Sequence, residues 1–175
     1  MISDFICNLD FRIWTCVECG KIQAMKSILR FLGLRKKIVV ATGGGFDPIH
    51  EGHIRLLKEA KKLGDVLVVT LNSDEQLKKK KGQPFYPSQD ERKEILESIR
   101  YVDKVIIDPG KDVTCEEALK LVKPDILAKG GDRVEGSMPE IELKVCKEMG
   151  IKIVYNVGGD KVQSSSWLIK RLKGS

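Results

Sequence analysis

Residues 38–53 decide the fold. They read Ile-Val-Val-Ala-Thr-Gly-Gly-Gly-Phe-Asp-Pro-Ile-His-Glu-Gly-His. The first five residues are apolar or β-branched, which predicts a buried strand over 38–42 that ends at the glycine triplet 43–45. A helical pattern follows from about Gly52 to Leu63. The stretch therefore predicts a strand, a glycine turn and a helix, in the order that begins an α/β fold.

The rest of the chain continues the same alternation of strands and helices. Further apolar runs predict strands over 66–71, 105–107, 125–128 and 151–155. Capping-box patterns predict helices that start at Ser73, Ser88, Thr114 and Ser137, and a last helix is expected from about Ser164 to Leu172. Apolar strands separated by helices are typical of a parallel sheet that is covered on both faces. We therefore expect a Rossmann-like, doubly wound α/β domain of about five parallel strands over residues 38–175.

Composition agrees with a single domain. Of 175 residues, 42% are hydrophobic and 32% are charged, which argues against a disordered chain, a collagen-like chain and a disulfide-stapled miniprotein. Five cysteines without a secretory signal indicate reduced thiols and a cytoplasmic location. Cys16 and Cys19 have the spacing of half a zinc knuckle, but a second ligand pair is missing, so no metal site is predicted there.

The surplus positive charge lies mainly in residues 1–37. This N-terminal extension holds seven Lys/Arg and three Asp/Glu, net +4, whereas residues 38–175 hold 24 and 22, net +2. Within residues 21–37, apolar residues at helical spacing with basic residues between them predict a short basic amphipathic helix. We expect it to pack on its own domain or to fray, and weak contact with a membrane surface is the alternative. No nucleic-acid partner is expected, and Met25 is an alternative start of the natural product.

The two histidines of the chain, His50 and His53, lie at the predicted start of one helix. A spacing of three residues places both on one face of its first turn, where backbone N–H groups and the helix dipole favour an anion. The glycines before them let the backbone come close to a bulky anion. We interpret this segment as a phosphate site, in preference to a shared metal ion or to ordinary surface histidines. In sheets of this kind ligands bind at the carboxyl ends of the strands, which also points to segments 129–133 and 156–166.

Several segments resemble the cytidylyltransferase-like nucleotidyltransferases. Gly45–His53 is similar to the HxGH signature of that family. Leu71–Glu75, Glu91–Leu96 and Ile99–Asp103 resemble segments of glycerol-3-phosphate cytidylyltransferase. Lys129–Asp132 and Ser164–Ile169 are more similar to the adenylyltransferase domain of the bacterial heptose-phosphate enzyme. The resemblance runs from Lys37 to the carboxyl end.

The resemblance implies an enzyme that transfers a nucleoside monophosphate from an NTP to a phosphorylated acceptor and releases pyrophosphate. It implies catalytic roles for His50, His53, Lys81 and Arg92, and acceptor binding by Arg100. The residues that it implies for nucleotide binding are Gly44, Gly45, Phe46, Asp47, Lys78, Gly131, Asp132, Ser164, Ser165 and Ser166. One of the three serines is expected to be a helix N-cap.

The choice of substrate stays open at this level. We favour ATP slightly over CTP, and a sugar or polyol phosphate such as a heptose 1-phosphate as the acceptor. The alternatives are a CTP-dependent enzyme of the glycerol-3-phosphate type and a non-catalytic nucleotide-binding protein. Mg²⁺ is expected to arrive with the NTP, held largely by phosphate oxygens and water, so no protein ligand is predicted. Relatives of this kind are commonly dimers, so a homodimer is a further expectation.

Overall fold

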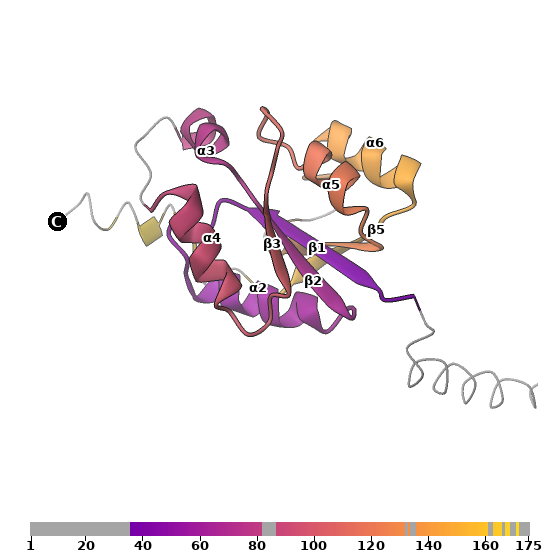
Figure 1. Cartoon of the computed structure of the whole chain (residues 1–175), viewed down its shortest axis with the longest axis horizontal. Helices are drawn as coiled ribbons and strands as arrows, with labels where there is room; N and C mark the ends of the chain where they lie inside the picture. Colours follow the sequence, from indigo (N-terminus) through magenta and orange to yellow (C-terminus); the bar gives the residue numbers. More distant parts are fainter. Residues whose placement is uncertain are drawn as a thin grey trace, which may run out of the picture. The chain divides into compact units, whose positions relative to one another are not determined.

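The sheet is built from five short strands, the elements richest in β-branched residues. The computed structural model describes residues 36–81, 87–131, 133, 136–160, 163–165, 167–168 and 171, the side chain of Lys81 excepted. Within them the strands are β1 (Val39–Gly44), β2 (Val66–Leu71), β3 (Lys104–Ile107), β4 (Ile126–Gly130) and β5 (Lys152–Val157). They form one parallel sheet in the order β3-β2-β1-β4-β5 (Figure 1). This confirms the predicted doubly wound, Rossmann-like α/β fold.

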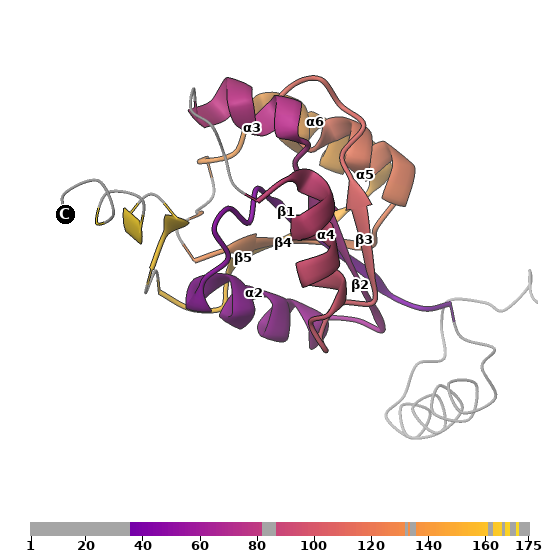
Figure 2. The ribbon, with the colours of Figure 1, turned by 60° about the vertical axis from the view of Figure 1, so that its left-hand side comes forward.

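Five helices connect the strands in the described part of the chain, and a few helical residues follow β5. The helices are α2 (Glu51–Lys61), α3 (Asp74–Lys81), α4 (Gln89–Glu97), α5 (Glu116–Val122) and α6 (Glu140–Met149), and Ser165, Trp167, Leu168 and Arg171 are helical as well. In Figures 1 and 2, α2 and α4 lie on one face of the sheet, and α5 and α6 lie on the other. Figure 2 also shows α3 beyond the end of the sheet where β1 leads into α2. The parallel sheet is thus covered on both faces, as its apolar strands require.

Each face of the sheet has its own hydrophobic core. Val40 and Ala41 are neighbours in β1, and they point to opposite faces because side chains alternate along a strand. Val40 packs in the cluster that includes Leu57 of α2, whereas Ala41 packs in the cluster that includes Leu119 of α5 and Val145 of α6. All five of these side chains are buried. The two cores fix the sheet between its helices and so fix the edge from which the β1–α2 turn emerges.

The predicted helix starts are confirmed in two of four places. Ser73 and Ser88 form capping boxes, Ser73 with Gln76 and Ser88 with Glu91. The capping boxes predicted at Thr114 and Ser137 are wrong. The N-cap of α5 is Cys115 and that of α6 is Pro139, and neither residue caps its helix with a side-chain hydrogen bond. A local capping pattern is therefore not sufficient at these two positions, since tertiary context can override local preference.

The N-terminal extension lies outside the described residues. The amphipathic helix predicted within residues 21–37, the contact with a membrane surface, and the Cys16 and Cys19 pair therefore stay predictions. Among the described helices, none has the length and apolarity needed to cross a membrane.

Candidate active site

The turn between β1 and α2 forms the centre of the site. After β1, Phe46 adopts a left-handed conformation (φ 48°) and buries its ring in the core, with 4% of the residue exposed. The chain then reaches His50, the N-cap of α2, in extended conformation (φ −150°, ψ 173°). The positive end of the α2 dipole therefore lies beside the turn, where it favours an anion.

The two imidazoles stack on one another at this helix start. Their ring centroids are 3.8 Å apart with an interplanar angle of 19°, and the Phe46 ring lies 4.7 Å from the His53 ring. The backbone N–H of His50 donates to Nδ1 of His53 at 3.3 Å. Because Nδ1 accepts this hydrogen bond, the proton of neutral His53 is on Nε2, which can donate to a phosphate oxygen. The predicted pairing of the histidines is thus present, with a defined tautomer for one of them.

Gly52, between the histidines, makes room for the stack. A Cβ at this position would lie 3.1 Å from both Cε1 and Nδ1 of the His50 ring, which is tighter than most real contacts. A larger residue would therefore push the ring of His50 away from that of His53. The close approach of the His50 ring thus explains why a glycine occupies position 52 of the His50-Glu51-Gly52-His53 motif.

A cavity of about 540 Å³ opens at this edge of the sheet. It collects residues from the ends of all five strands, or directly after them, and from the starts of α2, α5, α6 and the helical segment at Ser165. The predicted site residues that line it are Gly44, Gly45, Phe46, Asp47, His50, His53, Gly131, Ser164 and Ser165. Segments that are more than 100 residues apart in the sequence therefore meet around the β1–α2 turn, as the strand-end rule predicts.

The lysine run on α3 contributes to the cavity through Lys80. Lys80 lines the cavity together with Leu77, which lies three residues earlier on the same helix face. Lys78 is exposed and is not among the lining residues, and the side chain of Lys81 lies outside the described residues. Lys79 donates to the carbonyl oxygen of Lys111 at 2.8 Å. Of the lysines on α3 whose side chains are described, Lys80 lines the cavity and the predicted Lys78 does not, whereas the role of Lys81 stays a prediction.

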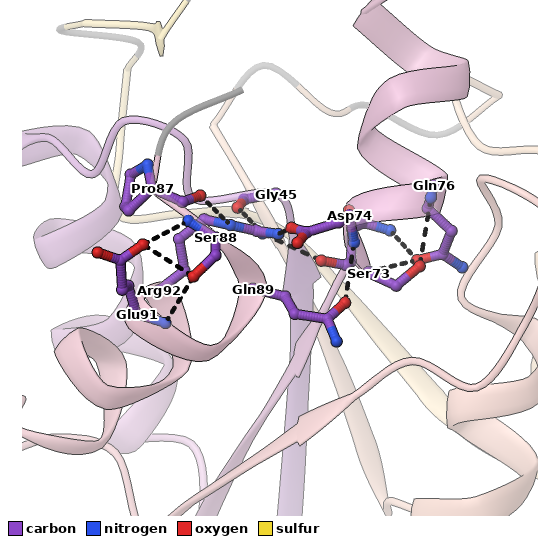
Figure 3. A network of polar contacts seen from close by, with 10 residues as sticks. Gly45, Ser73, Asp74, Gln76, Pro87, Ser88, Gln89, Glu91 and Arg92 are labelled. Carbon is purple, nitrogen blue, oxygen red and sulfur yellow. Dashed lines mark hydrogen bonds and ion pairs between the residues drawn. The ribbon is translucent and has the colours of Figure 1, made fainter. Parts of the chain in front are cut away.

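Arg92 lies behind the site and not in it. Only 1% of the residue is exposed, and it does not line the cavity. Figure 3 shows its guanidinium between three segments of the chain. Nη1 donates to the carbonyl oxygens of Gly45 (2.7 Å) and Asn72 (3.0 Å), Nη2 donates to Asp74 (2.7 Å), and Nε donates to Pro87 (3.2 Å). This geometry fits a residue that positions the turns after β1 and β2, and the predicted catalytic role of Arg92 stays a prediction.

Arg100 is also separate from the cavity. It is exposed, in the turn between α4 and the start of β3, and its guanidinium lies 5.7 Å from the centre of the Tyr101 ring. The cavity is at the opposite end of the strands, so the structure does not bring Arg100 to the predicted acceptor site within this chain.

The serines and glycines at the far side of the cavity have distinct tasks. Ser164 is the predicted N-cap, since its Oγ accepts from the backbone N–H of Trp167 at 3.3 Å. Ser165 donates from Oγ to the carbonyl oxygen of Pro48 at 3.0 Å, which joins this helix start to the β1–α2 turn. A Cβ on Gly131 would lie 1.7 Å from the carbonyl oxygen of Gly159, so only glycine allows β4 to end so close to the turn after β5. Asp132 and Ser166 lie outside the described residues.

The cavity also contains a cluster of polar residues that were not predicted as site residues. Its members are Asp108, Cys115 and Glu142, which are buried, and Lys129, whose side chain is 14% exposed. Lys129 donates to Glu142 at 2.8 Å, and Glu142 also accepts from the backbone N–H of Cys115 at 3.1 Å. Asp108 follows β3 directly, so the strand-end rule applied to β3 would have found it.

Burial controls the ionisation of this group. It raises the pKa of the Cys115 thiol to about 12, so this cysteine is an inert thiol at neutral pH. Burial also raises the pKa of Asp108, with contributions from the negative charges of Glu117 and Glu142, although the backbone N–H of Gly110 offsets part of the shift. For Glu142 burial acts in the same direction, but the ammonium of Lys129 and the hydrogen bonds from Cys115 together outweigh it and lower the pKa.

A glycine turn, stacked imidazoles at a helix start and a lysine around one cavity are typical of a phosphate-binding enzyme site on an α/β fold. Comparison with known proteins gives the family. A model of the cytidylyltransferase-like family matches residues 41–171. The chain belongs to this family and is a nucleotidyltransferase.

Three relatives illustrate how the similarity is distributed. FAD synthase of Pyrococcus abyssi is 39% identical over 143 residues, which cover 78% of this chain and 93% of the relative. Bifunctional protein HldE of Aliarcobacter butzleri is 42% identical over 154 residues, which cover 85% of this chain but 31% of the relative. The crystal structure of the lipopolysaccharide core biosynthesis protein from Thermoplasma volcanium has a TM-score of 0.59 and 34% identity, and the match covers 69% of this chain and 97% of that protein.

Proposed function

We propose that the chain transfers the adenylyl group of ATP to a phosphate monoester and releases pyrophosphate. The observation that carries the proposal is the stack of His50 and His53 at the N-terminus of α2, in one cavity with the glycine turn and Lys80. The similarity to FAD synthases supports ATP over CTP, because FAD contains an adenylyl group joined to a flavin phosphate. A cytoplasmic location is part of the proposal, and the free thiols of Cys115 and Cys146 agree with it.

The mechanism follows from the charge that develops during transfer. A phosphate oxygen of the acceptor attacks the α-phosphorus, a new P–O bond forms, and the bond to the β-phosphate oxygen breaks as pyrophosphate leaves. Nε2–H of His53 and the dipole of α2 stabilise the negative charge on the non-bridging oxygens. Lys80 offers a mobile positive charge for the leaving pyrophosphate. No protein nucleophile is needed, because positioning and electrostatic stabilisation suffice for this step.

Mg²⁺ fits this site as the companion of the triphosphate. Among the described residues there is no group of three or more metal-ligating side chains. Magnesium sites in such enzymes use one or two carboxylates together with substrate phosphates and water. Asp47 is buried, lines the cavity next to the histidines and is the carboxylate best placed for that use. The ion would neutralise part of the triphosphate charge.

Two acceptors deserve a direct comparison. Flavin mononucleotide is favoured by the FAD synthases, whose length this chain covers almost completely. A sugar phosphate such as a heptose 1-phosphate is favoured by the Lys129–Asp132 segment, on which the resemblance to the heptose-phosphate enzyme rests. The alternative of glycerol 3-phosphate with CTP belongs in the same panel.

The test is pyrophosphate release from each of the four NTPs with these three acceptors. We expect turnover with ATP, and a loss of about 100-fold or more in His53→Asn, because one preorganised donor is removed. Asparagine can still accept from the backbone N–H of His50, so circular dichroism should show an intact fold. Pyrophosphate release with CTP alone would overturn the choice of base, and near-full activity of His53→Asn would contradict the assigned role.

A further inference from the structure

One side of the cavity is lined by buried acidic and polar groups that the transfer of the adenylyl group does not use. On this side of the cavity, Lys129 and Glu142 form an ion pair whose side chains are only 14% and 6% exposed. The thiol of Cys115 lies 3.8 Å from the ammonium of Lys129. The positive charge of Lys129 is therefore engaged, and it is not available as a bare cation for a phosphate group.

Asp108 has an unused acceptor in this same part of the cavity. The residue is 3% exposed, and its Oδ1 accepts from the backbone N–H of Gly110 at 2.8 Å. Its Oδ2 is buried and has no hydrogen-bond partner among the residues that the structure describes. The side-chain amide of Gln76 also lowers the pKa of this carboxyl as a hydrogen-bond donor, and it donates to the carbonyl oxygens of Gly110 (3.1 Å) and Asp112 (2.6 Å) as well. A buried acceptor without a donor is unfavourable for folding, and such groups are expected to have a functional partner.

The backbone at Asp108 lies across the sheet from segments that are predicted to bind the nucleotide. Gly131 and Ser164, which are predicted to bind the nucleotide, belong to the side of β4 and β5. Asp108 follows β3, which lies two strands from β1 in the other direction. Neighbouring strands are about 4.8 Å apart, so roughly 10 Å separate the end of β3 from that of β1. This distance suits the body of an acceptor whose phosphate reaches the histidines.

We propose that Oδ2 of Asp108 accepts a hydrogen bond from a hydroxyl or N–H group on the body of the acceptor. The inference rests on the proposed function and deepens it, since it describes the class of acceptor. Lys129 neutralises Glu142, and the carboxylate of Asp108 repels a second anionic group in this part of the cavity. The acceptor is therefore a phosphate monoester whose body is uncharged and carries hydrogen-bond donors, and not a bisphosphate.

The test compares the wild-type protein with Asp108→Asn and Asp112→Asn. Asp112 lies on the same loop with its side chain exposed and outside the cavity, so its variant is a matched control. Turnover is measured with ATP and flavin mononucleotide or heptose 1-phosphate, and the Kd for ATP alone is measured by calorimetry. We expect Asp108→Asn to lower kcat/KM for the acceptor by about 10- to 100-fold, as loss of a hydrogen bond to a charged group does. The Kd for ATP should stay within about twofold, and Asp112→Asn should match the wild type.

Each other outcome rejects the assignment of Asp108. Weaker binding of ATP to Asp108→Asn would place the donor on the nucleotide, and a higher requirement for Mg²⁺ would make Asp108 part of a cation site. An unchanged kcat/KM in a wild type that turns over would reject the role of Asp108 and leave the proposed function intact. A wild type that is inactive with every pair of NTP and acceptor would overturn both. Asparagine keeps an oxygen for the N–H of Gly110, and a melting curve checks that the loop remains folded.

Discussion

Arg92→Ala tests whether the buried arginine organises the site from behind. Its guanidinium holds the carbonyl oxygens of Gly45 and Asn72, one at the end of each of two neighbouring strands, and the carboxylate of Asp74. Alanine removes all of these donors and leaves a space where a large, fully buried side chain had been. The turn after β1 then loses the contact that fixes its backbone.

The expected loss in the free energy of unfolding follows from the burial of the ion pair between Arg92 and Asp74. Removing one partner of a buried ion pair costs about 3–5 kcal/mol. Asp74 is 33% exposed at its side chain, and water offsets part of the loss, so we expect about 3 kcal/mol. For a domain of this size that corresponds to a fall of roughly 10 °C in Tm. Arg92→Lys keeps the charge but cannot form the same fork of donors, so we expect an intermediate loss of about 1–2 kcal/mol.

Urea unfolding and pyrophosphate release are measured on both Arg92 variants and on Arg100→Ala. Arg100 is exposed, so its variant should unfold within about 0.5 kcal/mol of the wild type. In Arg92→Lys we expect KM for ATP to rise together with the loss of stability, because the turn that binds the phosphate is less ordered. A large fall in kcat without any change in the free energy of unfolding would refute this reasoning and would support the predicted catalytic role of Arg92.

The remaining predictions concern a glycine, a lysine and a carboxyl group. Gly131→Ala should destabilise the domain by about 1–3 kcal/mol in urea unfolding because its Cβ meets backbone, whereas Gly130→Ala, whose Cβ would have its nearest neighbour at 3.7 Å, should not. Lys80→Ala should raise KM for ATP and Lys78→Ala should leave it unchanged, and equal effects would contradict the placement of Lys80 in the cavity. Asp108→Asn should melt at a higher temperature than the wild type at pH 7. Because the pKa of Asp108 is raised in the folded protein, ionisation of this carboxyl lowers the stability of the wild type as the pH rises from about 3.8 through the pKa of the folded state. The higher melting temperature of Asp108→Asn should therefore disappear below the ordinary aspartate pKa of about 3.8.

The sequence was sufficient for the fold and for the centre of the site. Apolar runs such as Val66–Leu71 are long enough and uniform enough to predict buried parallel strands, and this strand has the predicted bounds. His50 and His53 were found because local chain geometry alone, a glycine turn followed by a helix start, places them together. The strand-end rule then brought in Ser164 and Gly131, although more than 80 residues separate them from the turn.

What the sequence could not supply depends on tertiary packing. A charged residue on a helix looks the same in sequence whether it is exposed or buried, so Arg92 and Arg100 could not be told apart. The choice among the lysines of α3 depends on which face packs inward, and Leu77 decides it. The strand-end rule could have located Asp108 after β3, but the raised pKa of its carboxyl group depends on burial and on neighbours that come from α5 and α6.

The hydrogen bond from the backbone of His50 to the ring of His53 has an evolutionary consequence. The imidazole that is proposed to meet the phosphate also anchors the first turn of α2, so selection for folding and selection for turnover act on the same ring. In a duplicated copy of this gene that had lost its activity, folding would still favour a residue at position 53 whose side chain accepts the hydrogen bond from the backbone of residue 50. Histidine at position 53 in a homologue is therefore weak evidence that the homologue is active.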